Sequence, residues 1–423
     1  MATSRSSSSL LAGTNEESGL PASRIFSLRG DASRFPGSDG PVKPRPAVPA
    51  WPDAAKLFAP LIRWFDDSRR ELPWRAMDLE PLHPDPYSVL VSELMLQQTQ
   101  VATVVPYFER WMRSFPDPAT LAGASEESVH KHWEGLGYYR RARHLQQAAH
   151  AIADRGWPSD LQGLLQLPGL GPYTAAAVAA IAFQLPTPAL DGNALRVAAR
   201  LLALEDPRSV QAELRDWLRP ALARLGPSRT TQGIMELGAL VCLPKNPRCV
   251  ECPIARACAA KSTGCIDRCP AVRKRPAPRE VELWLVALSS NGAWLLERPA
   301  EKGLLAGLWR WPALSLPPAA ATAAEALVPF GVRDAAALAG WVQSYSHRRE
   351  HVLPCWISTD LPPAAGPGRA WIPGDALDGL PMGRRDQRLR DLLRAPFETL
   401  ETDPPMAAIL AAIAASDPAA QPS

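Results

Sequence analysis

Apolar residues three and four positions apart recur from Trp51 to Val241, and this spacing predicts helices. Leu57, Leu61 and Phe65 form one such stripe. Short turn sequences rich in Pro and Gly interrupt the pattern at intervals along this part of the chain. We therefore expect an all-α domain of about ten helices over residues 51–241.

The pattern changes after residues 270–280, a basic, Pro-rich stretch that we interpret as a stiff linker. Val281–Leu288 is apolar and typical of a buried strand, Asn291-Gly292 is a hairpin signal, and Ala293–Glu297 continues as a second strand.

Further elements are expected in the same region. His351–Ile357 is expected to be another strand, and residues 319–328 and Arg384–Leu393 are expected to be helices. Residues 281–400 are thus predicted to form an α+β domain, which makes the protein multi-domain.

Both ends of the chain lack periodicity. Residues 1–50 are rich in Ser, Pro, Gly and Arg, and we expect a disordered arm there. Residues 401–423 are Ala-rich with polar ends and are predicted to be a flexible tail.

Composition and charge narrow the class of protein. The 423 residues include 7 Cys, too few for a disulfide scaffold, and no apolar run approaches the roughly 20 residues of a membrane span. The net charge is only +3, but Lys245 to Arg275 contains eight Lys or Arg against two Asp or Glu. Such a run fits a polyanionic partner, although it is also typical of a solvated surface.

Four cysteines form the strongest chemical signal. Cys242, Cys249, Cys252 and Cys258 lie within 17 residues, with one Cys-x-x-Cys pair. Structural zinc sites usually have two such pairs, so we interpret residues 242–269 as a 4Fe-4S cluster loop and keep zinc as the alternative. Three further cysteines lie outside the pattern and are expected to be ordinary thiols: Cys265, Cys269 and Cys355.

The segment Leu167–Thr174 contains two glycines two positions apart and leads into an Ala-rich helix. Gly169 and Gly171 allow bare N–H groups to approach a ligand at a helix N-terminus, which suits a DNA phosphate. This is a helix-hairpin-helix pattern; the alternative is a plain Gly-Pro turn between two helices.

Two carboxylates stand in contrasting surroundings. Glu93 lies in an apolar run, where desolvation favours its neutral acid form, and Asp191 precedes a helix, where N–H groups favour its ionised form. An acid and a carboxylate held in different protonation states are what cleavage of a glycosidic bond requires. Taken singly, and without other evidence, Glu93 would be interpreted as a solvent-facing Glu and Asp191 as a plain N-cap Asp.

Several segments, in order, resemble the MutY-type adenine DNA glycosylases. The resemblance covers residues 55 to 260 and is carried by Leu72–Arg75, Ser92–Val101, Trp133–Tyr139, Leu167–Thr174, Asp191–Asn193 and the four-Cys loop. The run Leu94–Gln100 is specific to this family, whereas the hairpin and the four cysteines are shared with endonuclease III relatives.

The resemblance implies removal of adenine mispaired with 8-oxoguanine or guanine in double-stranded DNA, leaving an abasic site. Glu93 would protonate the adenine, Asp191 would stabilise the cationic sugar, and Tyr173 and Asn193 would hold these groups. Bifunctional relatives have a Lys where this chain has Tyr173, so we expect little strand cleavage.

Contacts with DNA are implied in the same way. Trp74 and Arg75 would wall the adenine pocket, and Gln98, Leu136 and Tyr138 would insert near the lesion; their alternatives are a surface amide, a core Leu and a core Tyr. Gly169 and Gly171 would bind phosphate.

Residues 281–400 resemble the family's C-terminal Nudix-like module but lack the Glu-rich helix that binds magnesium in a Nudix hydrolase. Residues 297–299 and 303–309 match its opening strands. Tyr345, Ser346 and His347 fall where the family has a Phe-Ser-His loop that contacts 8-oxoguanine.

Two rival functions are disfavoured by the sequence. A pyrimidine glycosylase and lyase would have a Lys at position 173 and no second domain, and a non-catalytic iron-sulfur DNA-binding protein would have lost Glu93 or Asp191. We expect a monomer with no membrane association, located in the cytoplasm of a bacterium with GC-rich DNA and associated with the nucleoid.

Overall fold

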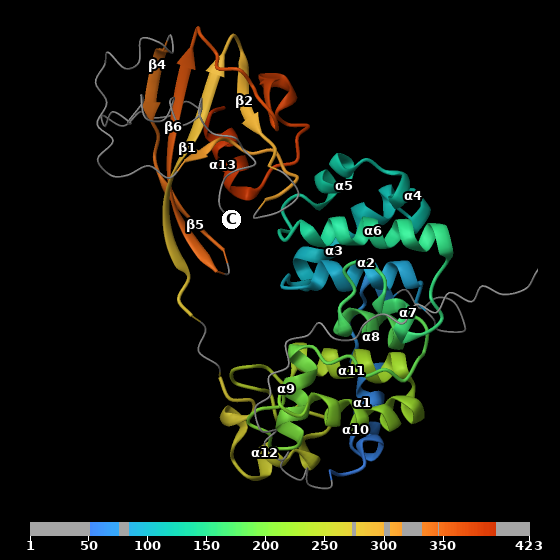
Figure 1. The fold of residues 1–423 in the computed structure, drawn as a ribbon. Coiled ribbons are helices and arrows are strands. Elements are labelled where there is room, and N and C mark those ends of the chain that lie inside the picture. The colour runs from blue at the N-terminus through green and yellow to red at the C-terminus, as the bar shows by residue number, and fades with distance from the viewer. Residues whose placement is uncertain are drawn as a thin grey trace, which may run out of the picture. The chain divides into compact units, whose positions relative to one another are not determined.

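The computed structural model describes residues 51–75, 84–272, 276–299, 305–314, 332–345 and 347–394, which belong to one compact unit beginning at Pro49. The expected arm, the tail, the helix at 319–328, Ser346 and residues 303–304 lie outside these ranges. Figure 1 shows helices in the first part of the chain and strands in the second.

The helical region extends from Ala54 to Leu240 and matches the predicted all-α character. Its first helices are α1 (Ala54–Ser68), η1 (Pro73–Arg75, a 3-10 helix), α2 (Pro86–Leu96), α3 (Val101–Ser114), α4 (Pro118–Gly123) and α5 (Glu126–Trp133). They are followed by α6 (Arg140–Arg155), α7 (Leu161–Leu165), α8 (Pro172–Ile181), α9 (Gly192–Leu201), α10 (Gln211–Leu225) and α11 (Pro227–Leu240).

Two separate cores hold these helices. The first is built around Leu90, Trp111 and Trp133, and the second around Phe58 and Leu237. The helices α2 and α8 are apolar on almost every side and are buried along most of their length. A polar residue inside such a helix is therefore removed from bulk water.

The four-Cys loop follows α11 and contains only short helices. They are η2 (Ala255–Ala257), α12 (Ala259–Ser262) and η3 (Ile266–Arg268).

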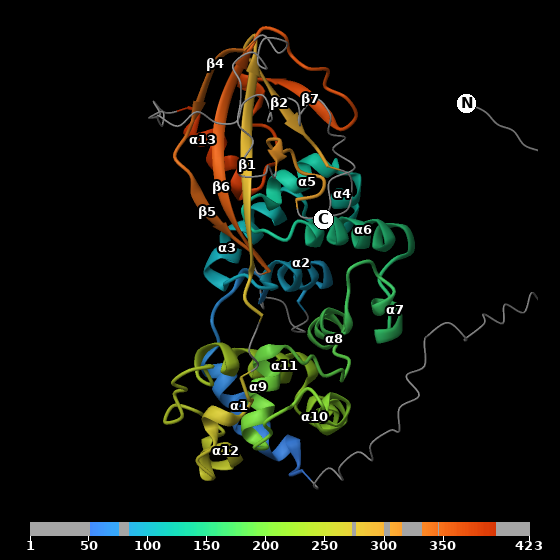
Figure 2. The same cartoon turned by 60° about the vertical axis from the view of Figure 1, so that its left-hand side comes forward.

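The sheet region begins at Arg279, two residues before the predicted strand. The described residues form a seven-stranded sheet in which β1 lies between β6 and β2, as Figure 2 shows. Asn291 and Gly292 both have positive φ, +48° and +77°, which confirms the predicted hairpin turn. The elements are β1 (Arg279–Ser290), β2 (Ala293–Glu297), β3 (Ala313–Leu314), β4 (Val332–Ala337), β5 (Trp341–Ser344), β6 (Arg348–Thr359), β7 (Arg369–Pro373), η5 (Gly374–Ala376) and α13 (Arg384–Leu392).

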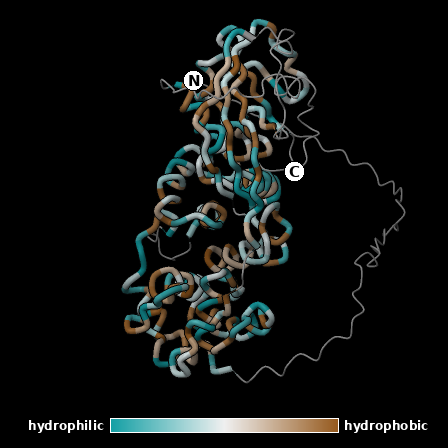
Figure 3. The backbone as a smooth tube through the Cα atoms, turned by 90° about the vertical axis from the view of Figure 1, so that its left-hand side faces the viewer, coloured by the Kyte–Doolittle hydropathy of each residue, from teal (hydrophilic) through white to brown (hydrophobic). Residues whose placement is uncertain are grey.

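Strands β1 and β6 pair in parallel over eleven positions, from Arg279 opposite Arg348 to Ser289 opposite Ser358, and the other pairings are antiparallel. Alternate residues of β1 enter two cores on opposite faces: Leu283 and Leu285 pack in a core with Leu389 of α13, while Val286 and Leu288 pack in the other. Figure 3 shows apolar positions recurring along helices and strands alike.

The sheet region contacts the helical region through specific bonds. Tyr139 Oη donates to the Met382 carbonyl at 3.2 Å, and Lys131 Nζ donates to the Asp378 carbonyl at 2.7 Å. Leu308 is fully buried in the first helical core. These contacts connect α5 and α6 with the loop that precedes α13.

Candidate active site

Glu93 is a carboxyl group buried in an apolar helix. It lies in α2 between buried apolar residues, and only 7% of it is exposed. Burial raises its pKa from 4.5 to about 7; Asp191 adds to the rise, while a hydrogen bond from Tyr173 and the charge of Arg75 oppose it. Near neutral pH a large fraction of Glu93 is therefore the neutral acid.

Tyr173 reaches Glu93 from the helix-hairpin-helix segment. Its Oη donates to Glu93 Oε2 at 2.8 Å. Burial and the two nearby carboxyl groups raise the pKa of Tyr173 well above 10, so the phenol keeps its proton and remains a donor.

The hairpin turn depends on a glycine. Gly169 has φ +78°, and a Cβ there would lie 2.3 Å from the Cβ of His144, so no other residue fits without a shift. Gly171 is the N-cap of α8 and places Pro172 and Tyr173 in its first turn. The predicted Ala-rich helix is α8, which extends over Pro172–Ile181.

Asp191 is the N-cap of α9. Its Oδ1 accepts a hydrogen bond from Ala194 N at 2.6 Å, as the N-cap prediction requires. Asn193, expected to hold the catalytic groups, lies in the first turn of α9, and its Oδ1 accepts a hydrogen bond from Arg196 Nη2 at 2.8 Å. Arg196 Nη2 also donates to the Gly238 carbonyl at 2.8 Å, so this bond fixes α9 against α11.

One cavity of about 380 Å³ brings the predicted catalytic residues together. Glu93 enters it from α2, Tyr173 from α8 and Asp191 from the start of α9. The other predicted residues that line it are Trp74, Arg75, Gln98 and Asn193. Segments separated by a hundred residues in the chain thus form one pocket with an acid and a carboxylate in it.

Sequence reasoning missed Glu236, which lies on α11 at the same cavity and is 1% exposed. Arg70 makes two side-chain bonds to it at 2.8 Å each, and Arg75 makes one at 2.9 Å. Burial alone would raise the pKa of Glu236, but the two guanidinium groups lower it to about 2. The signal in the sequence was a single charge inside the apolar run Ile234–Leu240.

Gln98, which lines this cavity, is paired with Tyr138, which lines a second one. Both have positive φ, +58° and +49°, which non-glycine residues rarely adopt, and Tyr138 Oη donates to Gln98 Oε1 at 2.5 Å. Both are exposed, Tyr138 at 47%. Strained, exposed side chains of this kind cluster at functional sites.

Leu136 is buried, unlike Gln98 and Tyr138, with which it was predicted to enter the DNA. It is 6% exposed and belongs to the first helical core, which favours the alternative of a core leucine.

Arg141 was also missed, and it joins the two segments that carry Gln98 and Tyr138. Its Nη1 donates to the carbonyls of Leu94, Met95 and Gln97 at 2.6–3.0 Å, and its Nη2 donates to those of Leu136 and Gly137 at 3.3 and 3.0 Å. Burial lowers the pKa of Arg141 to about 10, so it is still charged at neutral pH.

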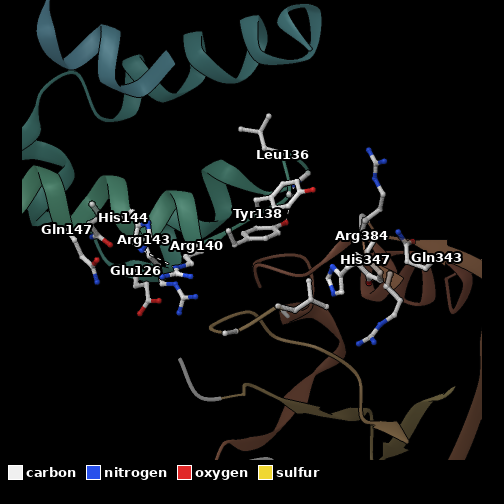
Figure 4. Close-up of a pocket in the computed structure, with 18 of the residues that line it drawn as sticks. Glu126, Leu136, Tyr138, Arg140, Arg143, His144, Gln147, Gln343, His347 and Arg384 are labelled. Atoms are coloured by element: carbon white, nitrogen blue, oxygen red, sulfur yellow. Dashed lines mark hydrogen bonds between the residues drawn. The ribbon is translucent and has the colours of Figure 1, made fainter. Parts of the chain in front are cut away.

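A larger cavity of about 1430 Å³ is lined by Leu136 and Tyr138 and by Tyr345 and His347 of the sheet region. Figure 4 shows Tyr138 and Arg140 across from His347 and Arg384. The guanidinium of Arg348 lies 5.8 Å from the ring centre of Tyr345. Ser346, the third residue of the predicted recognition loop, lies outside the described residues.

The four cysteines of the predicted cluster loop lie near one another, and none of them lines either cavity. Burial raises the pKa of Cys252 to about 11, and the charges of Cys242, Cys258 and Cys249 add to the rise. Arg200 Nη1 donates to Cys242 Sγ at 3.4 Å, and Cys258 Sγ donates to the Arg200 carbonyl at 3.3 Å. In the described part of the chain no three His, Cys, Asp or Glu residues are arranged to hold a single metal ion.

The fold and the cavity define a helix-hairpin-helix DNA glycosylase, and the family model agrees: residues 91–220 match the family described as HhH-GPD superfamily base excision DNA repair protein. A solved structure of a thermostable thymine-DNA glycosylase matches with a TM-score of 0.44 and 23% identity, covering 49% of this chain and 97% of that one.

Two curated relatives are adenine DNA glycosylases. The one from Mus musculus is 33% identical over 384 residues, 76% of this chain and 74% of the relative. The one from Mycolicibacterium smegmatis is 40% identical over 211 residues, 48% of this chain and 69% of the relative. The chain belongs to the adenine DNA glycosylase family and is an enzyme of base-excision repair that removes adenine from DNA.

No helix among the described residues is both long and apolar enough to cross a membrane.

Proposed function

We propose that the enzyme hydrolyses the N-glycosidic bond of adenine mispaired with 8-oxoguanine or guanine in double-stranded DNA and leaves an abasic site. The observation that carries the proposal is the buried Glu93, with a pKa of about 7, in one cavity with Asp191. A base inside a duplex cannot reach this cavity, so the adenine is flipped out of the helix, at a cost of a few kcal/mol of unstacking.

Glu93 is the general acid in this proposal. Its neutral form protonates the adenine ring at N7, and the resulting cationic purine is a good leaving group. The Tyr173 hydroxyl, which donates to Glu93 Oε2, leaves the other carboxyl oxygen to carry the proton toward the base. After departure of the base, the Glu93 carboxylate can activate water.

Asp191 stabilises the positive charge that develops on the sugar. Its Oδ1 is held by the Ala194 N–H, so the carboxylate is oriented before the reaction begins. Trp74 and Arg75 are walls of the cavity, and the ion pair with Glu236 holds the charged guanidinium of Arg75 in place there.

Tyr173 supports hydrolysis without strand cleavage. A lyase reaction requires an amine that forms an imine with the sugar, and a phenol cannot form one. We infer that the enzyme is essentially monofunctional.

In this proposal the helical region and the sheet region both contact the DNA at the lesion. Gln98 and Tyr138 would enter the duplex beside the extruded adenine, and Gly169 and Gly171 would present N–H groups to phosphate. Tyr345, Ser346 and His347 would contact the 8-oxoguanine, supported by the position of Tyr345 and His347 on the same cavity as Tyr138.

The four cysteines fit a 4Fe-4S cluster as a structural group. Cys252 lies close enough to Cys242, Cys249 and Cys258 for their charges to act on it, and four thiols with only one Cys-x-x-Cys pair support an iron-sulfur cluster rather than zinc. Bound thiolates would fold residues 242–269 into a loop that presents Lys245, Arg248 and Arg256, all exposed, to DNA phosphate.

The proposed division of the chain has five further parts around the catalytic domain of residues 51–241: an arm (1–50), the cluster loop (242–269), a linker (270–280), a recognition domain (281–400) and a tail (401–423). We also propose a monomer located with the nucleoid in a bacterial cytoplasm.

Incubation with defined duplexes tests the function. We expect loss of adenine opposite 8-oxoguanine and opposite guanine, no excision of oxidised pyrimidines, and little nicking until alkali cleaves the abasic site. Excision of oxidised pyrimidines with prompt nicking would instead favour an endonuclease III-type function.

A further inference from the structure

Two cysteines outside the predicted cluster ligands lie next to each other. Cys265 Sγ and Cys269 Sγ are 3.6 Å apart and form a small core with Ala260. The helix η3 (Ile266–Arg268) lies between them, and Arg268 N donates to the Cys265 carbonyl at 3.0 Å. This short turn brings the two side chains to the same place.

The distance between the sulfurs is short enough for bond formation. A disulfide places its sulfur atoms about 2 Å apart, and rotation of the two side chains can close the difference from 3.6 Å. Cys355, by comparison, is fully buried in β6 and packs among Val286, Leu288 and Ile357 in an apolar core.

We propose that Cys265 and Cys269 are a redox-active dithiol that a hydroperoxide converts into a reversible disulfide. Intracellular disulfides of this kind are usually transient and redox-sensing rather than structural. The two cysteines do not line the adenine cavity and are not among the four predicted cluster ligands, although Cys258 packs against their small core.

The exposures of the two cysteine residues assign their roles. Cys265 is 8% exposed and Cys269 is 1% exposed, so Cys265 meets the peroxide first. Thr263 Oγ1 lies 3.1 Å from Cys265 Sγ and donates to the Ala259 carbonyl at 2.7 Å, and rotation of the hydroxyl can turn its proton to a Cys265 thiolate.

The reaction balances with one hydroperoxide. The Cys265 thiolate attacks the terminal peroxide oxygen, the O–O bond breaks, and the leaving oxygen departs as water or an alcohol after protonation. This gives a sulfenic acid at Cys265. The Cys269 thiolate then attacks that sulfur, the S–S bond forms, and the hydroxyl leaves as water, so the two thiols lose two hydrogens in total.

The disulfide would restrict the backbone at the C-terminal end of the predicted cluster loop, around Cys269. The Cys269 carbonyl accepts a hydrogen bond from Arg200 Nε at 3.0 Å, and Ala271 N donates to the Glu205 carbonyl at 2.8 Å. Arg200 also donates to Cys242 Sγ. A covalent bond at Cys269 therefore fixes the segment that Arg200 joins to the first of the four cysteines.

Peptide mapping of the full-length protein tests the proposal. The chain is treated with stepwise amounts of hydrogen peroxide, its remaining thiols are alkylated, and it is digested with trypsin. Cleavage after Arg268 places Cys265 and Cys269 on separate peptides, residues 262–268 and 269–273, so only a disulfide keeps them together. We expect the linked pair, lighter by two hydrogens than the sum of its thiol peptides, and its disappearance on treatment with dithiothreitol.

Two variants test the roles of the individual cysteines. Cys269→Ser should stop the reaction at the sulfenic acid of Cys265, which dimedone traps, while Cys355→Ser should give the same linked pair as the unchanged protein. Recovery of both peptides separately alkylated at peroxide levels that oxidise methionine would overturn the proposal. Linkage of either cysteine to one of the four predicted ligands would overturn it as well.

Discussion

Tyr173 Oη donates to Glu93 Oε2 across 2.8 Å, and this bond joins the helix-hairpin-helix segment to the buried acid of α2. Burial raises the pKa of Glu93 to about 7, and the tyrosine partly opposes that rise because it stabilises the carboxylate. The pair thus keeps Glu93 near the middle of its titration at neutral pH, where an acid can both give and accept a proton.

The rate of adenine release should fall as pH rises through about 7, because only the neutral form of Glu93 protonates the base. In Tyr173→Phe the pKa of Glu93 loses the influence that lowers it, so the descending limb should move to higher pH. Single-turnover rates measured across pH 5.5 to 9 would compare the two proteins. Identical descending limbs in the two proteins would show that Tyr173 does not influence the pKa of Glu93.

The free energy of unfolding should also depend on pH through Glu93, and it should fall as pH rises. The pKa of Glu93 is raised from 4.5 to about 7, so the stability it contributes is fully present below pH 4.5 and is lost as pH rises through about 7. The loss amounts to about 3 kcal/mol, from about 1.4 kcal/mol for each pH unit. Glu93→Gln should flatten this part of the curve of unfolding free energy against pH, measured by denaturant titration.

Asp191→Asn should lower the rate of base release by about 10² or more, because it removes the charge that stabilises the developing cation. The amide can still accept the Ala194 N–H bond, so the start of α9 should remain intact. Asp160→Asn is a matched control, since Asp160 caps α7 through Gly163 N at 2.7 Å away from the cavity. Equal rates of base release for Asp191→Asn and Asp160→Asn would show that Asp191 has no role in the reaction.

Arg141→Lys should destabilise the protein by about 3 kcal/mol, because an ammonium cannot reach carbonyls on both segments and leaves buried acceptors unpaired. The position of Gln98 relative to Tyr138 should loosen with it, so mismatch binding should weaken as well. Arg155→Lys, at the exposed end of the same helix, is the control. Thermal unfolding and DNA-binding titrations measure the two effects, and an unchanged melting temperature would contradict this role.

Borohydride reduction during turnover should give little covalent protein–DNA adduct, since no amine occupies position 173. An endonuclease III-type enzyme on its own substrate serves as the positive control. Adduct formation in similar yield would show that another amine forms an imine, and the enzyme would then be bifunctional.

Much of the fold could be predicted from local patterns. The helix after Gly171, the hairpin at Asn291-Gly292 and the helix from Arg384 follow from turn chemistry and periodicity close to each element. The cavity residues were predicted by family resemblance together with the contrast between a buried Glu and a capping Asp.

The rest depends on contacts between distant residues. Arg70 and Glu236 are 166 positions apart, and the five-carbonyl clamp of Arg141 exists only once α2 and the loop before α6 have met. The parallel pairing of β1 with β6 is similarly non-local. No local pattern carries such information, because each partner alone is an ordinary charge or strand.

Single-turnover adenine release by Glu93→Gln, with a duplex carrying adenine opposite 8-oxoguanine, tests the central claim most directly. Binding of the same duplex is measured in parallel, so that a loss of catalysis is separated from a loss of affinity. We expect binding to be retained and base release to be abolished. Release at a rate near that of the unchanged enzyme would contradict the assignment of Glu93 as the acid.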